Sequence, residues 1–200
     1  KFMNLQKNGE KSKMVTGTIV TIAGGILWGV SGVCGQYMFQ NKGVTAPWLV
    51  SVRLVVAGLL MLCYYFLTDR EQTLAIWKSK RDRRGVIIYG LLGMLPCQYA
   101  YFQTIEWSNA GTATVIQYLG PALIVIWVCF RTKRMPTLQE ITGVILAVIG
   151  VFLIATHGNP TSLALSGRAL LMGLASAVSV AIYTLEPARL QKKYDTPLIL

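Results

Sequence analysis

The chain has 200 residues, of which 54% are hydrophobic and only 14% are charged. A soluble domain carries about 25% charged residues, so the composition excludes an ordinary soluble domain. The net charge of +11 comes from residues between long uncharged runs, several of which reach the roughly 20 apolar residues that a membrane-spanning helix needs.

Six of these runs predict membrane-spanning helices, and a seventh begins at "DTPLIL". In chain order the six are Val15–Phe39, Pro47–Leu67, Val86–Ile105, Trp107–Phe130, Ile141–Thr156 and Ala169–Leu185. The predicted fold class is therefore an all-α polytopic membrane protein.

The distribution of Lys and Arg predicts the orientation of these spans. Sixteen of the nineteen lie in the amino-terminal tail and in the second, fourth and sixth connections, whereas Lys42 and Arg168 lie on the other side. Because cytoplasmic loops carry the excess of cations, the amino terminus is predicted to be cytoplasmic and the protein to lie in the cell membrane. This topology explains the net charge without a nucleic-acid partner. The stretch "KSKRDRR" after Trp77 is predicted to face anionic lipid headgroups of the bilayer.

The first span contains "GGILWGVSGVCGQYMF", which combines small residues with a polar face. Gly25 and Gly29 form a GxxxG pair, a pattern that predicts close helix packing. Trp28, Gly32 and Gln36 are spaced by four residues and therefore share one face. Two interpretations of Trp28 stay open, a wall of a polar cavity and a lipid-facing side chain.

Arg53 lies inside the second span, about 9 Å along the helix from Pro47. A charge within the membrane costs at least about 2.5 kcal/mol on insertion scales. The guanidinium could reach back to the outer headgroups. Alternatively it faces an aqueous cavity, where a carboxylate of a substrate or of a partner helix would pair with it.

The third and fourth spans carry prolines followed or preceded by amides and phenols. Pro96 removes a backbone hydrogen bond and predicts a kink in the third span, and Pro121 lies in the fourth span. The polar residues beside them are Gln98, Tyr99, Tyr101, Gln103, Gln117 and Tyr118. Such residues line solute pockets and also form ordinary hydrogen bonds between helices, and the sequence leaves both open. In the fifth span, Gly143 and Gly150 predict a packing helix.

Catalytic and metal-binding patterns are absent from the sequence. The four cysteines lie in apolar runs without CxxC spacing, and the single histidine, His157, follows the fifth span. The acids Glu106, Glu140 and Glu186 lie at span edges, and no HExxH or phosphate loop occurs. We therefore expect no enzyme, no cofactor and no metal.

A shift of 150 residues places the first span and its polar turn over the sixth, with Gly17 over Gly167 and Pro47 over Pro197. Five spans separate the two copies, so the second copy enters the membrane from the opposite side and an inverted repeat is expected. The predicted organisation is a basic tail (1–13), a first repeat of five helices (14–158) and the start of a second repeat (165–200), as part of a ten-helix carrier.

Four stretches together resemble the EamA-type carriers of the drug/metabolite transporter superfamily. They are "ILWGVSG", "PWLVSVRLVVAG", "YFQTIEWSNAGTATVIQYLGPALIVIW" and "KRMPTLQEITGVILAVIGVFLI". The family commonly has a glutamate where this chain has Lys133, so the helix-end interaction of that acid is expected to be lost or supplied by Glu140. The resemblance implies two inverted five-helix halves around a pocket that opens alternately to each side, and it implies small polar metabolites or amino acids as substrates, often moved outward.

The predicted function is a secondary transporter that exports small polar metabolites or amino acids across the cytoplasmic membrane by alternating access. The predicted substrate-binding residues are Trp28, Gln36, Arg53, Gln98, Tyr99, Tyr101, Gln117 and Tyr118. The alternative is a non-transporting membrane scaffold or small-molecule sensor with the same helical bundle. The expected partners are a small-molecule substrate and the lipid bilayer, and a homodimer is left open.

Overall fold

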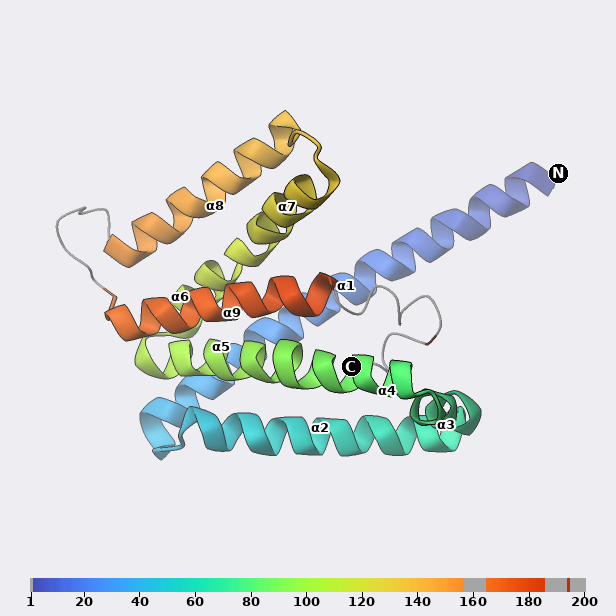
Figure 1. Ribbon diagram of the computed structural model, residues 1–200, viewed down its shortest axis with the longest axis horizontal. Helices are drawn as coiled ribbons and strands as arrows, with labels where there is room; N and C mark the ends of the chain where they lie inside the picture. Colours follow the sequence, from blue (N-terminus) through green and yellow to red (C-terminus); the bar gives the residue numbers. More distant parts are fainter. Residues whose placement is uncertain (1, 157–164, 186–193, 195–200) are drawn as a thin grey trace.

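The computed structural model describes residues 2–156, 165–185 and 194, and their regular structure is helical throughout (Figure 1). The elements are α1 (Phe2–Lys42), α2 (Ala46–Thr68), α3 (Arg70–Lys78), α4 (Lys80–Ile88), the π-helix η1 (Tyr89–Met94), α5 (Leu95–Trp107), α6 (Ala110–Gln117), α7 (Leu119–Thr132), α8 (Leu138–Thr156) and α9 (Gly167–Leu185). His157, Glu186 and the start of a seventh span lie outside the described residues.

Six helical stretches of the described chain are long and apolar enough to cross a membrane. They are Val15–Lys42, Ala46–Thr68, Lys80–Trp107, Ala110–Thr132, Leu138–Thr156 and Gly167–Leu185. The prediction of an all-α polytopic membrane protein is thereby confirmed. The inverted repeat and the domain boundaries stay predictions, because α9 is the one span of the second copy that the structure describes.

The boundary between the third and fourth spans differs from the predicted one. Trp107 was expected to begin the fourth span, but it ends α5. The fourth span begins at Ala110, because the side chain of Asn109 accepts a hydrogen bond from the Thr112 amide at 2.8 Å and caps α6. Asn109 thus sets this boundary through capping, which hydrophobicity does not report.

A π-helical turn precedes Pro96, where the sequence predicts a kink. The turn is η1, and the Leu95 amide bonds to the Gly90 carbonyl, five residues earlier. A π turn shifts the hydrogen-bond register within a helix, so α4, η1 and α5 continue as one span despite the amide that Pro96 lacks.

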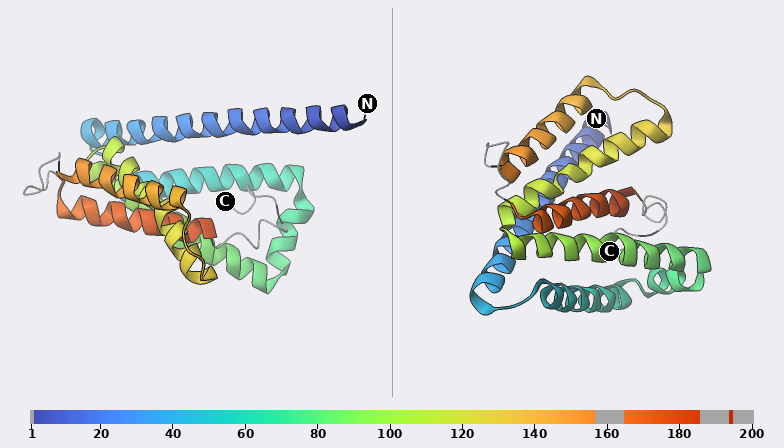
Figure 2. Two further views of the ribbon diagram at one scale, coloured as in Figure 1. Left: turned by 90° about the horizontal axis from the view of Figure 1, so that it is seen from above. Right: turned by 60° about the vertical axis from the view of Figure 1, so that its left-hand side comes forward.

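Helix α5 lies at the centre of the bundle, between α2 and α9 (Figure 1). It also contacts α1 and α6, and α1 crosses this row of helices at a slant (Figures 1 and 2). The main buried cluster comes from α2, α5 and α6, and contains Ala46, Val50, Tyr101, Phe102, Ile105, Ala110 and Ala113. The residues of α5 are therefore the ones that position a site within the bundle.

The predicted packing at Gly25 and Gly29 is wrong for the described residues. A Cβ atom added at either position would meet nothing within 4 Å. The close approach occurs further along α1, where a Cβ at Gly32 would lie 2.9 Å from the Tyr101 hydroxyl and a Cβ at Gly35 would lie 2.6 Å from Phe102 Cε1. Small residues permit close approach only on the face that has a partner, and in α1 that face passes through Gly32 and Gly35.

The glycines of α8 are likewise open. A Cβ at Gly143 or Gly150 would meet nothing within 4 Å, whereas Val151 and Ala155 of the same helix are buried. The expectation that these two glycines serve close packing is therefore also wrong for the described residues. Helix α8 packs on α7 and α6 through branched and small side chains instead.

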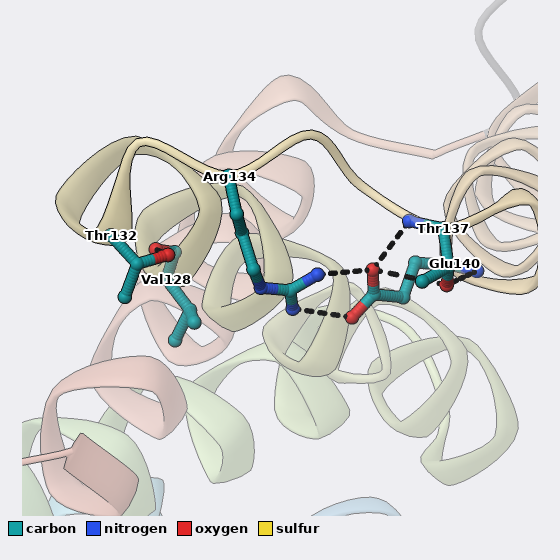
Figure 3. Close-up of polar contacts among 5 residues, drawn as sticks. All are labelled: Val128, Thr132, Arg134, Thr137 and Glu140. Carbon is teal, nitrogen blue, oxygen red and sulfur yellow. Dashed lines mark hydrogen bonds and ion pairs between the residues drawn. The ribbon is translucent and has the colours of Figure 1, made fainter.

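The turn between α7 and α8 is held by Glu140 (Figure 3). Arg134 donates two hydrogen bonds to its carboxylate, at 2.9 and 2.7 Å. The Thr137 amide donates to Glu140 Oε2 at 2.7 Å, and the Glu140 amide donates to Thr137 Oγ1 at 3.3 Å, which together make a capping box at the start of α8. Lys133 ends α7 in a left-handed conformation with φ 53°. Of the two outcomes left open for the helix-end acid, loss or supply by Glu140, the contacts of Glu140 favour the second.

Candidate functional site

Arg53 of α2 is half-buried and directed into the bundle. Its Nη1 donates a hydrogen bond of 2.6 Å to Ser31 Oγ of α1, and its Cζ lies 5.1 Å from the centre of the Phe102 ring of α5. The ion pair of the described residues is Arg134–Glu140, so no carboxylate of the described chain pairs with Arg53. These contacts favour the inward-facing interpretation of Arg53 over a side chain that reaches back to the headgroups.

Tyr101 of α5 lies beside this guanidinium and connects three helices. Its hydroxyl is 2.9 Å from Thr114 Oγ1 of α6, and Thr114 donates its own proton to the Ala110 carbonyl at 2.7 Å. The Tyr101 hydroxyl is therefore the donor to Thr114, because a hydroxyl has one proton. The Trp28 ring of α1 lies 5.6 Å from the Tyr101 ring, centre to centre. Trp28 thus packs against the bundle through Tyr101.

Gln36 and Glu106 cap the N-termini of α6 and α2. Both caps lie at the end of the bundle that is farther from α3. Gln36 Oε1 of α1 accepts the Ala110 amide of α6 at 2.8 Å. Glu106 Oε2 of α5 accepts the Ala46 amide of α2 at 2.8 Å and the Gln103 side-chain amide at 2.9 Å. A carboxylate at a helix N-terminus is favourable because it meets unpaired amides and the positive end of the helix dipole. Glu106 is a helix-capping position that sequence reasoning left unassigned, since its partner lies 60 residues away.

Gln117 belongs to a second polar group, which joins α5, α6 and α9. Its Nε2 donates to Ser176 Oγ at 2.7 Å and lies 3.6 Å from Cys97 Sγ. All three side chains are buried. Ser176 was missed from sequence because a single serine in an apolar run carries no local signal of its partner.

Gln98 is the neighbour of this group along α5, and it is 3% exposed. Its Oε1 is buried and has no hydrogen-bond partner among the described residues. An unpaired buried acceptor costs about 1–3 kcal/mol, so this oxygen is suited to accept a donor.

Tyr99 and Tyr118 are exposed, and among the described residues their side chains make no hydrogen bond to either polar group. Tyr99 is 36% exposed and Tyr118, at the break between α6 and α7, is 64% exposed. Of the eight predicted substrate-binding residues, the structure gathers Trp28, Arg53 and Tyr101 at one place and Gln117 at another. Gln36 caps α6, and Gln98 is buried beside the second group. Their role in substrate binding stays a prediction.

An apolar groove lies between α7 and α9, with a volume of about 790 Å³. Its lining includes Leu123, Trp127, Phe130, Val178 and Ile182, with Arg131 at its edge. None of the eight predicted substrate-binding residues lines it.

Replacement by leucine is expected to change the stability of the protein differently at the two buried glutamines, Gln98 and Gln117. Gln117→Leu removes a hydrogen bond between helices and should lower the free energy of unfolding by about 0.6 kcal/mol, the average for such bonds in membranes, and by at most about 1.7 kcal/mol. Gln98→Leu removes the unpaired oxygen and should leave the midpoint of thermal denaturation in detergent unchanged or raised. Equal destabilisation by the two substitutions would contradict the unpaired state of Gln98 Oε1. A binding role of Gln98 would appear as lost solute flux at unchanged stability.

The described architecture is that of a polytopic helical membrane protein with polar side chains enclosed between its spans. A profile described as the EamA-like transporter family matches residues 15–156, and the chain belongs to this family. The chain is also similar to the uncharacterized inner membrane transporter YicL of Salmonella typhimurium, with 38% identity over 180 residues. The aligned part covers 90% of this chain and 60% of that protein, so the chain spans about three fifths of the relative's length. No solved structure gives a significant match to the chain.

Proposed function

We propose that the protein is a secondary carrier that moves small polar metabolites or amino acids outward across the cytoplasmic membrane by alternating access. The amino terminus is cytoplasmic in this proposal, as the distribution of Lys and Arg indicates. Membership of a transporter family supports transport as the activity. The environment of Arg53 is the observation that supports a particular class of substrate.

The Arg53 guanidinium has fewer partners than a buried cation requires. It carries five N–H donors, and the contacts that the structure gives it are one hydroxyl, Ser31, and one ring face, Phe102. A carboxylate binds a guanidinium through two parallel hydrogen bonds, which are about twice as strong as neutral ones. A solute that bears a carboxylate is therefore the ligand that Arg53 fits best.

Trp28, Tyr101 and Thr114 supply the rest of the proposed site. The rings of Trp28 and Tyr101, which lie against each other, offer an apolar surface to the body of the solute. The Tyr101–Thr114–Ala110 chain of hydrogen bonds fixes the phenol in place. This combination of one charge, a few polar groups and aromatic walls is typical of small-molecule sites.

Solute flux into proteoliposomes tests the proposal. The purified protein is reconstituted and offered radiolabelled amino acids and other small carboxylates, with and without a proton or sodium gradient. At least one carboxylate should cross faster than in liposomes that lack the protein. Binding of such a solute without any flux would favour the sensor alternative, and absence of both would refute the proposal.

A further inference from the structure

The segment from Arg70 to Arg84 forms a corner of the molecule, which we call the α3–α4 corner. It contains six cations and two acids. Helix α3 runs across the ends of α2 and α4 instead of alongside them (Figures 1 and 2). A short helix in this position lies along the membrane surface when α2 and the α4–α5 span cross the membrane.

The inner face of the corner is fixed to the bundle. Thr73 and Ile76 are each 3% exposed, and Ile76 packs with Tyr89 and Tyr194. The Tyr194 hydroxyl donates to Asp82 Oδ2 at 2.9 Å, and the Ser79 hydroxyl caps α4. The outer side chains of the corner are therefore presented from a rigid support.

The outer face of α3 carries two large apolar side chains between the charged residues Arg70 and Glu71 at its start and Lys78 at its end. Leu74 is 40% exposed and Trp77 is 51% exposed, although both are large hydrophobic side chains. At the first end of α3, the Arg70 guanidinium lies over the Phe66 ring, 4.9 Å from its centre. Exposed apolar groups on a surface helix with cations at its ends are typical of helices that lie in the membrane interface.

The outer face of α4 changes from charged to apolar within about one turn. Lys80, Arg83 and Arg84 are exposed, and one turn later Ile87 and Ile88 are exposed as well. Within the described part of the chain no ion pair occupies these three cations. A change from charged to apolar side chains over this distance is typical of a helix that passes from the lipid headgroups into the hydrocarbon.

We propose that the α3–α4 corner is a binding surface for an anionic phospholipid of the phosphatidylglycerol type. The lipid phosphate lies against Lys80, Arg83 and Arg84, and its acyl chains lie along Trp77, Ile87 and Ile88. The charge selects an anionic headgroup over a zwitterionic one, since each surface cation attracts anionic lipid. The apolar side chains favour a lipid over free phosphate, because free phosphate has no acyl chains that could contact them.

Trp77 is the reporter for the test, because it lies inside the proposed surface. The protein is placed in nanodiscs of phosphatidylcholine with a minority of phosphatidylglycerol, and bromine atoms are carried by the chains of one lipid or of the other. The fluorescence of wild type minus that of Trp77→Phe isolates Trp77 from the other tryptophans. Its quenching per brominated lipid should be at least about fivefold stronger with phosphatidylglycerol, since fivefold is the preference that a single surface cation supplies and the proposed surface has three.

Neutralisation of the three cations should remove this preference. In Lys80→Gln/Arg83→Gln/Arg84→Gln the quenching ratio should fall toward one, although Arg70, Lys78 and Arg81 remain, whereas Arg131→Gln/Lys133→Gln, which neutralises cations of another turn, should keep the wild-type ratio. If the triple variant does not fold, wild type at high salt gives the same test. At about 1 M salt the Debye length is about 3 Å, so the attraction between the surface cations and the lipid phosphate is screened. A ratio of one in wild type at low salt, or a preference that survives both neutralisation and salt, would overturn the proposal.

Discussion

Replacement of Arg53 by glutamine is expected to lower the kcat/KM of solute transport by about 10- to 100-fold. This factor corresponds to the roughly 1.5–3 kcal/mol that a hydrogen bond to a charged group contributes. The reason is the loss of the cation that the solute carboxylate would meet between Ser31 and Phe102. Initial rates of uptake into proteoliposomes measure this effect. The amount of protein in the membrane and its melting temperature should stay close to wild type, because the substitution removes a buried charge.

Two control variants separate loss of the charge from loss of packing. Arg53→Lys keeps the charge but not the paired geometry, so it should retain part of the flux. Ser31→Ala removes the one hydroxyl bonded to the guanidinium and should reduce flux less than Arg53→Gln does. Normal flux in Arg53→Gln would remove this residue from the solute site and with it the argument for a carboxylate-bearing substrate.

Replacement of Gly35 by leucine is expected to displace α1 from the bundle. A Cβ at this position would lie 2.6 Å from Phe102 Cε1 and 3.5 Å from Leu49 Cδ2, and Phe102 is fully buried. Overpacking of this kind costs about 1–3 kcal/mol, and more where the neighbours cannot move. The melting temperature of the detergent-purified protein measures the loss.

Gly29→Leu is the matched control for Gly35→Leu. The two substitutions add the same side chain to the same helix and gain the same helix propensity. A Cβ at Gly29 would meet nothing within 4 Å, so this variant should melt within a degree or two of wild type. Equal destabilisation by the two substitutions would show that α1 does not pack on α5 through Gly35.

The number and order of the spans were predictable from the sequence, because length and hydrophobicity alone decide which segments can cross a membrane. The boundaries of the spans depend on side-chain capping and on backbone hydrogen bonding, which the hydrophobicity of the sequence does not report. The capping side chain of Asn109 ends the turn before α6, and the π turn ahead of Pro96 keeps the third span continuous.

The polar candidates were predictable only as a set. Arg53 stood out because a charge in an apolar run is rare, and Trp28 because it shares a helix face with Gln36. Their partners, Ser31, Thr114 and Ser176, are ordinary residues in sequence, and their roles arise from contacts between helices. For the same reason the glycine pair was assigned to the wrong part of α1, since a spacing of four residues does not identify the face that has a neighbour.

Transport through the proposed site requires that water and solute reach the place where Arg53 meets Ser31. The most direct measurement is the labelling of Ser31→Cys by a membrane-impermeant thiol reagent, in a protein whose native cysteines are replaced by alanine. Thiols react as thiolates, which form in water and not in lipid. Val33→Cys, on an exposed face of the same helix, is the control. We expect Ser31→Cys to be labelled, to be protected by the transported carboxylate, and Val33→Cys to stay unlabelled. Failure of the reagent to reach Ser31→Cys from either side of the membrane would contradict the account.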